Sequence, residues 1–460
     1  FKINKLFKMK TIRIGLIVLS VLALASCKKY LDAKPDATLA IPSTLKDLQG
    51  LLDNYSAMSS QFTGGGEILA DNYYLNPEDW ASMYWSYERN YYIWQKDDHN
   101  DADWSQPYTN IFTCNLILET LGNIVISPSQ QITAQGIKGS ALFFRASYFY
   151  SLAQLFAKGY DKTTAGTDLG IPLRLVTDFE VPSKRATVQQ TYDQIISDFK
   201  QSVELLPTNS SLKTRPVKAA AYGSLARTYL TMQDYTNANL YADSCLQLYN
   251  TLIDYNSLDS NAADPINRFN SEVIFQAISL TQDPLSPSIC KIDSNFYRSY
   301  GENDLRKVIC FSDNGDSTYS FKGDYDGGSE NWGDCFTGIV TDEQYLIKAE
   351  CCARLGKTAD ALTYLNDLLS KRYRIGGFVP VTTTDSSELL STILKERRKE
   401  LLFRGTRLTD LKRLNQDPNF EVTLTRELNG TVYTLLPGDP RYVGLIPKTV
   451  IDLSGIEQNE

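Results

Sequence analysis

Apolar residues recur every three or four positions through most of this chain, which is the pattern of helices with one buried face. The pattern is strongest in eight segments: 111–121, 137–156, 188–206, 217–232, 236–248, 343–355, 359–369 and 389–403. Alternating, strand-like runs are few and short, and the clearest are 273–278 and 432–436. The sequence therefore predicts a mainly α fold with a few short strands.

Two of the predicted helix pairs share one spacing of aromatic and small residues. At a constant offset, one set of four positions matches another: Tyr222, Ala226, Ala238 and Ala242 match Tyr345, Ala349, Ala361 and Leu365. This is the spacing of tetratricopeptide (TPR) repeats, whose small residues let two helices approach closely. The chain between the pairs, about residues 250–340, is rich in Asp, Asn, Ser, Gly and aromatic residues. We expect TPR-like helix pairs interrupted by a long, ordered insertion.

The charge balance narrows the classes of function. The 460 residues carry 54 acidic and 46 basic side chains, a net charge of −8. Nucleic-acid binding depends on neutralising phosphates, so this balance argues against a nucleic-acid partner. The single histidine, His99, argues against a Ser-His-Asp or Cys-His catalytic site and against a multi-histidine zinc site. We expect no cofactor and no metal ion.

The N-terminal segment has the features of an export signal. Basic residues after Met9 precede an apolar run over 14–25, which suits a signal peptide and is too short to span a bilayer. The run ends in Leu-Ala-Ser before Cys27, which is the lipobox pattern. We expect residues 1–26 to be a lipoprotein signal peptide and Cys27 to carry the lipid. An ordinary cleaved signal with an incidental Cys27 is the alternative.

The rest of the chain is expected to be one anchored body. No later apolar run reaches 18 residues, so the lipid would be the membrane attachment. Residues 27–44 are polar, contain Pro35 and Pro42, and are predicted to be a lipid-anchored tether. Residues 45–460 are predicted to form a single domain.

The cysteines after Cys27 fall into two groups. Four lie in helical patterns, where a buried thiol is the default: Cys114, Cys245, Cys351 and Cys352. Three share the loop-rich insertion and could supply one disulfide: Cys290, Cys310 and Cys335.

Clustered carboxylates raise the question of catalysis or calcium binding. Glu396 and Glu400 are four residues apart on a helix, but cations interleave them, which favours a structural ion network over a glycosidase acid and base. The acidic run 97–103 lacks the glycine and the ligand alternation of an EF-hand, and 324–327 is only a weak calcium motif. We therefore predict no catalytic residue.

Several groups of residues together carry a family resemblance. They are Cys27 to Asp32 with Pro35; Trp104, Tyr108, Ile111, Asn115 and Leu118; Arg145-Ala146 with Tyr148 and Tyr150; Glu396 to Leu401 with Gly405, Arg407, Asp410-Leu411 and Arg413; and Asp439-Pro440-Arg441 with Ile446-Pro447. In this combination the chain resembles the SusD/RagB-like family of nutrient-binding lipoproteins of Gram-negative outer membranes. It departs from the family at Arg404, usually Glu, at Leu408, usually aromatic, and in a longer link over 159–170.

The resemblance implies a fold and a role. The fold would be a compact α-helical, SusD-like scaffold of about four TPR-like helix pairs with long binding loops. The protein would be anchored at the cell surface in the outer membrane, bind an oligosaccharide or other nutrient, and deliver it to a SusC-like, TonB-dependent transporter. The nutrient itself is left open.

Aromatic side chains are the candidate ligand contacts, because sugars pack on flat rings. Nine Tyr and Trp residues lie between Tyr73 and Trp94; of these, Tyr91, Tyr92 and Trp94 are expected in the core. Others lie among polar residues, where the resembling family places an aromatic loop, and the insertion adds more. The predicted ligand-binding residues are Trp80, Tyr84, Trp85, Tyr297, Tyr325 and Trp332.

Three classes of function remain open. The leading hypothesis is a binding protein without enzymatic activity. A surface lipoprotein glycoside hydrolase would need two carboxylates facing one cleft. A TPR-type peptide-binding assembly scaffold would need buried aromatic rings and an open, charged concave helix face.

Overall fold

The computed structural model describes residues 42–96, 101–327 and 332–460. The predicted signal peptide, Cys27, most of the predicted tether and His99 lie outside the described residues. The chain from Thr44 to Glu460 forms one compact unit. Among the described helices, none combines the length and the apolar character needed to cross a membrane.

All eight predicted helical segments are helices in the structure. The long helices are α8 (Ala102–Asn123), α9 (Gln131–Phe156), α10 (Val188–Leu205), α11 (Lys218–Thr231), α12 (Tyr235–Leu248), α15 (Thr341–Arg354), α16 (Thr358–Ser370) and α17 (Ser386–Glu400). Local chemistry fixes their ends: Thr187 and Gln190 form a capping box at the start of α10. Gly356 adopts a φ of +74° in the turn after α15, a conformation that glycine reaches without steric cost. The mainly α prediction is confirmed.

Shorter helices fill the remaining chain, and several precede α8. They are α3 (Leu45–Leu52), α4 (Tyr55–Met58), α5 (Gly65–Ile68), α6 (Pro77–Ser82), α7 (Ser86–Tyr92), α13 (Ser294–Arg298), α14 (Arg306–Ile309), α18 (Arg407–Leu414) and α19 (Lys448–Ser454). The 3-10 turn η3 (Asp283–Leu285) lies within the insertion. These segments are too short for helical periodicity to reveal them.

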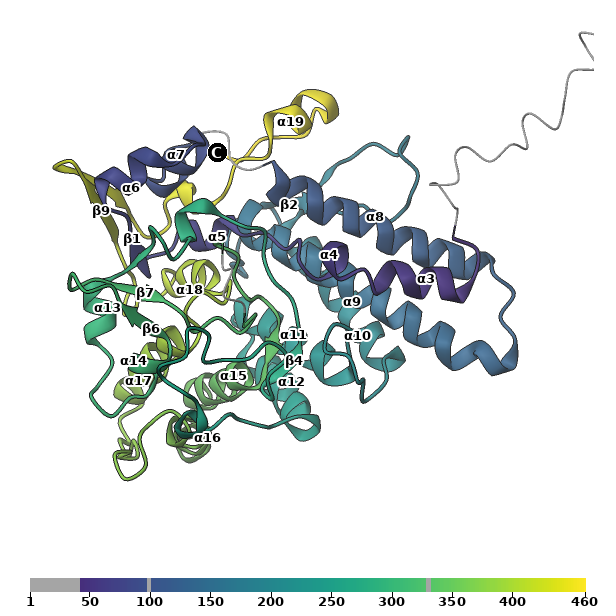
Figure 1. Cartoon of the computed structure of the whole chain (residues 1–460). Coiled ribbons are helices and arrows are strands. Elements are labelled where there is room, and N and C mark those ends of the chain that lie inside the picture. Colours follow the sequence, from purple (N-terminus) through teal and green to yellow (C-terminus); the bar gives the residue numbers. More distant parts are fainter. Residues whose placement is uncertain (1–41, 97–100, 328–331) are drawn as a thin grey trace, which may run out of the picture. The chain divides into compact units, whose positions relative to one another are not determined.

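The long helices form a continuous array. Helix α8 packs on α9, α9 on α10, α10 on α11, α11 on α12, α12 on α15 and α15 on α16, as Figure 1 shows. The small residues of both TPR-like pairs lie at the helix contacts: Ala226 and Ala238 in one pair, and Ala349 and Ala361 in the other, are fully buried. The absence of a large side chain at these positions allows the close approach. The TPR-like prediction is confirmed for α11–α12 and α15–α16.

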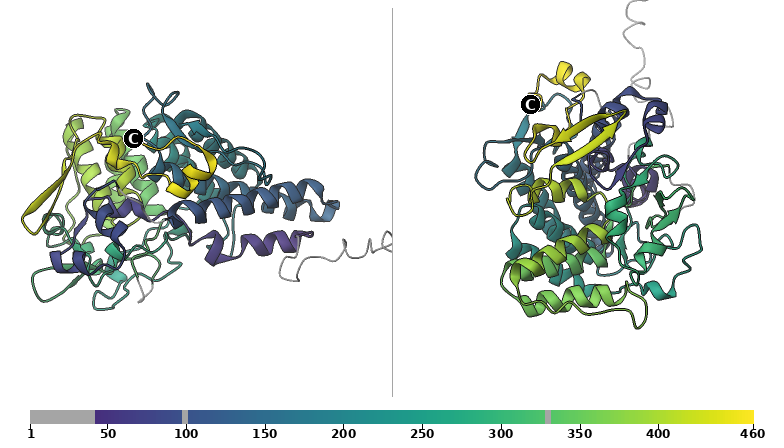
Figure 2. Two further views of the ribbon diagram at one scale, coloured as in Figure 1. Left: turned by 90° about the horizontal axis from the view of Figure 1, so that it is seen from above. Right: turned by 90° about the vertical axis from the view of Figure 1, so that its left-hand side faces the viewer.

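The insertion between α12 and α15 consists mainly of loops and short strands, and Figure 2 shows it in green on one side of the helical array. Its strands are β4 (Val273–Phe275), β5 (Lys291–Ile292), β6 (Phe311–Asp313), β7 (Tyr319–Phe321) and β8 (Ile339–Val340). Val273 pairs with Val340 and closes the base of the insertion. Ile292 pairs with Tyr73 of β1 (Tyr73–Tyr74), which ties the insertion to the N-terminal helices.

Two further strand pairs lie outside the insertion. Strand β2 (Leu169–Pro172) pairs with β3 (Arg185–Thr187). Strands β9 (Leu424–Leu428) and β10 (Thr431–Leu435) form a hairpin whose turn, Asn429-Gly430, has positive φ at both residues. Asn-Gly is the sequence that such tight turns favour. The predicted strands 273–278 and 432–436 thus correspond to the shorter β4 and to β10.

Candidate functional site

Two exposed rings mark the segment between α6 and α7. The side chains of Tyr84 and Trp85 are 80% and 52% exposed, and their rings meet edge to face with centroids 4.7 Å apart. Trp80 is half-buried, and its Nε1 donates a hydrogen bond of 3.0 Å to the carbonyl of Arg89, which ties α6 to α7. The segment therefore presents two rings to solvent and uses a third to hold its shape.

Trp332 is the most exposed ring among the described residues of the insertion. It is 66% exposed, and the following residue, Gly333, accepts a hydrogen bond from the backbone N–H of Gln282. Gly333 has a φ of +103°, and a Cβ there would lie 2.1 Å from the Gln282 carbonyl oxygen. Only glycine permits this approach, so the backbone beside Trp332 is fixed against residue 282.

The fold brings these two segments to one short stretch of chain, residues 280–285, which we call the strap. Helix α7 packs on η3, the C-terminal part of the strap. The backbone N–H of Asp283 donates a hydrogen bond of 3.3 Å to Glu88 of α7. Trp85 is the residue directly before α7, and Trp332 adjoins the strap through Gly333. We call Tyr84, Trp85 and Trp332 the aromatic face.

Two other rings of the insertion, Tyr297 and Tyr300, are more enclosed. Tyr297 is partly buried and stacks on Tyr319, with ring centroids 3.5 Å apart. Tyr300 is 2% exposed and donates a hydrogen bond to the Lys399 carbonyl. Tyr297 therefore retains an accessible edge, whereas Tyr300 belongs to the core.

Tyr325, another predicted ligand contact, is buried in the structure. The ring is 1% exposed, its hydroxyl donates to Glu272, and the Arg404 guanidinium lies over it. Its polar sequence neighbours suggested a surface loop, but the ring covers a buried ion network instead. The expectation for Tyr91, Tyr92 and Trp94 is confirmed, since each is at most 7% exposed.

The carboxylates near the C-terminus belong to that ion network, as the sequence predicts. Arg306 contacts Glu396 at 2.5 Å and Glu400 at 3.0 Å, and Arg372 contacts Glu400 at 2.7 Å. Burial alone would raise the pKa of Glu396 and Glu400, but these arginines hold both pKa values below their ordinary range. A general acid needs a raised pKa, so this pair is not arranged for glycoside hydrolysis. The sequence analysis missed Arg306 and Arg372, which no local motif marks.

The weak calcium motif over 324–327 makes contacts within the protein. Asp326 accepts a hydrogen bond from Gln276 and pairs with Arg268 at 3.2 Å, so protein groups already satisfy its carboxylate. Within the described chain, no group of three or more Asp, Glu, His or Cys side chains is placed to hold a metal ion.

The seven described cysteines, Cys290, Cys310 and Cys335 among them, are free thiols. The disulfide that the sequence allows among these three is not formed.

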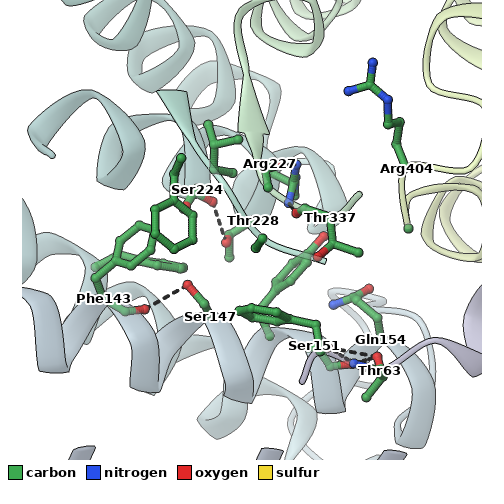
Figure 3. Close-up of a pocket in the computed structure, with 18 residues that line it drawn as sticks. Thr63, Phe143, Ser147, Ser151, Gln154, Ser224, Arg227, Thr228, Thr337 and Arg404 are labelled. Carbon is green, nitrogen blue, oxygen red and sulfur yellow. Dashed lines mark hydrogen bonds between the residues drawn. The ribbon is translucent and has the colours of Figure 1, made fainter. Parts of the chain in front are cut away.

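An interior cavity lies between α9, α11 and the chain around residue 338 (Figure 3). Its volume is about 70 Å³, whereas ligand pockets are typically about 300–1,000 Å³. Hydroxyls on its wall bond to nearby groups: Ser147 donates to the Phe143 carbonyl, and Thr228 to the Ser224 carbonyl. The wall of the cavity is partly polar and partly apolar, with four phenylalanines among its lining residues, and the cavity has room for a few water molecules but not for a sugar chain.

A larger groove, which the sequence analysis missed, lies between the chain around residues 172–183 and α19. It has a volume of about 470 Å³ and is lined in part by Tyr108, Phe179 and Leu453. Phe179 and Leu453 are 82% and 90% exposed, and Phe179 stacks on Phe112. The apolar residues at 173–181 were the available signal. This groove is a second place at which a ring could meet a ligand.

Comparisons with known proteins agree with this architecture. Residues 29–230 match a SusD-like family described as starch-binding and associating with the outer membrane, and residues 342–433 match the SusD family. A SusD-like protein of Formosa agariphila is 28% identical over 239 residues, 50% of this chain and 45% of that relative. The chain thus matches less than half the length of this curated relative.

Solved structures share the fold. A putative sugar-binding protein of Bacteroides vulgatus has a TM-score of 0.75 at 23% identity, over 91% of this chain and 99% of that one. A SusD superfamily protein of Bacteroides thetaiotaomicron has a TM-score of 0.71 at 23% identity, over 91% of this chain and 100% of that one. With both family matches and the motifs at Trp104, Arg145 and Glu396, the chain belongs to the SusD/RagB-like family.

Proposed function

We propose that this protein is a lipid-anchored surface protein of the outer membrane that binds an oligosaccharide without cleaving it and delivers it to a SusC-like, TonB-dependent transporter. The single observation that carries the binding proposal is the aromatic face. Large apolar rings exposed together are typical of interaction sites. The family description names starch binding, and the Bacteroides vulgatus neighbour is titled a sugar-binding protein, which supports a glycan over other nutrients.

The form of the site suits a binding protein. Tyr84, Trp85 and Trp332 lie on an open surface, where a long chain can be held at several points without being enclosed. Flat rings offer a large contact area and lose little conformational entropy on binding. We expect a dissociation constant between millimolar and micromolar, or roughly −4 to −8 kcal/mol.

The two alternative functions predict different experimental results. A glycoside hydrolase would release products, and one carboxylate substitution would abolish their release. A TPR-type peptide scaffold would bind peptides through the helical array, and its binding would not depend on the aromatic face. The ion pairs around Glu396 and Glu400 disfavour the first of these alternatives.

The binding proposal is tested on an array of neutral and acidic oligosaccharides, followed by calorimetry on each sugar that binds. Trp85→Ala and Trp332→Ala should each weaken binding about tenfold or more, because central rings carry a large share of such interfaces. Phe179→Ala is the matched control, since Phe179 is as exposed as Tyr84 but lines the separate groove. Loss of binding in Phe179→Ala alone would move the site to that groove. Chromatography of the incubated sugar checks that no product appears.

The delivery proposal needs its own test. The full-length, tagged protein is purified from outer membranes in mild detergent, and co-purifying proteins are identified by mass spectrometry. A TonB-dependent barrel in stoichiometric amount is the expected result. Its absence, with the protein correctly anchored and sugar binding intact, would contradict delivery while leaving the binding proposal standing.

A further inference from the structure

Two buried carboxyl groups hold the strap that connects the two parts of the aromatic face. Glu88 comes from α7 and is 3% exposed, and Asp103 comes from the first turn of α8 and is 2% exposed. Buried carboxylates usually pair with arginine or lysine, as Glu400 does in this protein. Glu88 and Asp103 instead contact backbone and amide N–H groups at the strap and beside it.

Asp103 fixes one side of the strap. Its Oδ1 accepts a hydrogen bond of 2.7 Å from the Gly64 N–H, and its Oδ2 accepts one of 3.1 Å from the Gly65 N–H. The Gln282 side-chain amide lies 3.5 Å from both oxygens. A Cβ on Gly64 would come within 2.7 Å of the Gln282 side chain, so the two segments are in close contact. Asp103 thus joins residues 64–65 to residue 282.

Glu88 fixes the other side. Its Oε1 accepts the hydrogen bond from the Asp283 N–H, while its Oε2 has no hydrogen-bond partner among the described residues. The carboxyl group of Asp283 lies near enough to influence the ionisation of Glu88. Residues 282 and 283 are therefore each held by a different carboxyl group, and the Gly333 carbonyl accepts a hydrogen bond from the same strap.

We propose that Glu88 and Asp103 are positioning residues whose protonation state sets how the strap positions Trp332 relative to α7 and Trp85. This proposal deepens the proposed function, on which its consequence for sugar binding rests. Neither carboxyl is expected to touch the sugar. Each acts through the strap: Glu88 through Asp283, and Asp103 through Gln282.

The electrostatics give the direction of the effect. Burial raises the pKa of Asp103 to about 7, against the lowering effect of the Gly64 and Gly65 N–H groups. Burial also raises the pKa of Glu88 to about 7; the Asp283 carboxyl adds to this rise and Arg89 opposes it. As the pH increases through 7, charge appears on both groups, and Glu88 then repels Asp283. The strap therefore loosens above pH 7 on its Glu88 side, while the N–H groups around Asp103 bind the ionised carboxylate more strongly on the other side.

Other titratable groups around the pair do not reverse this direction. They are Tyr87, Arg89 and Tyr91 on α7, Asp101 before α8, and Asp283 on η3. The nearby carboxylates add negative charge. Burial raises the pKa of both tyrosines well above the ordinary value, so both stay neutral near pH 7.

The test uses no sugar, so it is independent of whether the binding proposal succeeds. The full-length protein in detergent is labelled with 5-fluorotryptophan, and its five tryptophans give fluorine NMR signals that Trp→Phe variants assign. We expect the signals of Trp85 and Trp332 to shift together between pH 6 and pH 8 with a midpoint near 7. Trp94, which is buried and bonded to the Leu69 carbonyl, serves as the internal reference.

Glu88→Gln keeps an oxygen for the Asp283 N–H but cannot ionise, so the shift of Trp85 should disappear. The shift of Trp332 should become smaller, because Asp103 still titrates in this variant. Glu78→Gln, an exposed carboxyl on α6, should leave both shifts unchanged. If Glu88→Gln does not fold, as judged by thermal melting, Asp103→Asn takes its place and should reduce the shift of Trp332. Signals of Trp85 and Trp332 that stay fixed in the wild type, or that titrate identically in the variants, overturn the proposal.

A second measurement tests whether the protonation of Glu88 and Asp103, acting through the strap, changes the affinity for sugar. The oligosaccharide that gives the strongest array signal is titrated by calorimetry at pH 6 and pH 8. The wild-type protein should bind it several-fold more weakly at pH 8, whereas Glu88→Gln should show a smaller difference between the two pH values. An equal affinity of the wild type at the two pH values would show that strap movement does not reach the sugar.

Discussion

The guanidinium group of Arg404 lies 3.3 Å from the centre of the Tyr325 ring, with Asp342 3.5 Å from its Nη2. Position 404 is one at which the resembling family usually has a glutamate. The reversed charge is accommodated because Asp342 and the electron-rich ring face of Tyr325 both attract a cation. The departure therefore changes the local partners of the ion network and not the fold around it.

Arg407 should contribute strongly to stability. It donates hydrogen bonds of 2.7 Å and 2.9 Å to the two carboxylate oxygens of Asp71. Arg407→Ala leaves that carboxylate with Arg398, at 3.2 Å, as its remaining cationic partner, so the cost should be about 1.5–3 kcal/mol. Thermal and urea unfolding measure the loss. Lys448→Ala removes an exposed pair with Asp452 and should cost about 0–1 kcal/mol. An unchanged melting temperature in Arg407→Ala would contradict the buried network.

Substitutions of Trp80 and Tyr84 should differ in their effects on thermal stability and on sugar affinity. Tyr84→Ala removes an 80% exposed ring, so sugar affinity should fall by about 1–3 kcal/mol while the melting temperature stays unchanged. Trp80→Ala also removes the hydrogen bond to the Arg89 carbonyl and should lower both quantities. Calorimetry and thermal melting on the same samples check the contrast. Equal behaviour of the two variants would mean that Trp80 does not hold α6 to α7.

Glu67 should make stability depend on pH. It is 2% exposed, neither carboxyl oxygen has a hydrogen-bond partner among the described residues, and burial raises its pKa to about 7 despite nearby N–H groups of Arg407 and Gly405. A folded-state pKa above the unfolded value means that its contribution is complete below about pH 4.5 and is lost as the pH rises through 7.

Glu67→Gln should therefore change stability little at pH 5 and raise it at pH 8 by about 1–3 kcal/mol. Urea unfolding of the wild type and the variant at both pH values measures the difference. Glu78→Gln provides the exposed control and should show no such difference. A variant less stable than the wild type at pH 8 would indicate that the ionised carboxylate has a stabilising partner.

Cys27 should carry the lipid anchor. Labelling of growing cells with radioactive palmitate should mark the wild-type protein, and Cys27→Ala should abolish the label and release the protein from the membrane fraction. Cys290→Ala is the matched control, because that thiol is buried in the folded domain. Label retained by Cys27→Ala would place the acylation elsewhere.

The helical part of the fold was predictable because its signals are local. Each long helix carries its own periodicity, and the Ala226 and Ala349 spacing identifies the close pairs within a single repeat. The pairing of Tyr73 with Ile292 was not predictable, since nothing near either residue indicates the other. The same limit applies to Arg372, whose partners Glu272 and Glu400 come from different segments.

The rule that a ring among polar residues is exposed holds only in part. Tyr84, Trp85 and Trp332 follow it, and all three are exposed. Tyr325 breaks it: its polar neighbours suggested the surface, but Arg404, distant in sequence, draws the ring into the core. The role of Glu88 and Asp103 at the strap was not predictable, because both carboxyl groups accept hydrogen bonds from backbone groups that are distant in the sequence.

The pairing of β1 with β5 has a consequence for the order of folding. Closing a loop between residues 73 and 292 costs much more chain entropy than pairing neighbouring helices, so the local α-helical pairs are expected to form first. Arg426, still later in the chain, donates to the carbonyls of Ile68 and Ala70 near the same strand. The surface that carries Trp85 and Trp332 is thus assembled late, and a partly folded chain would have its helices before it had any place to recognise a ligand.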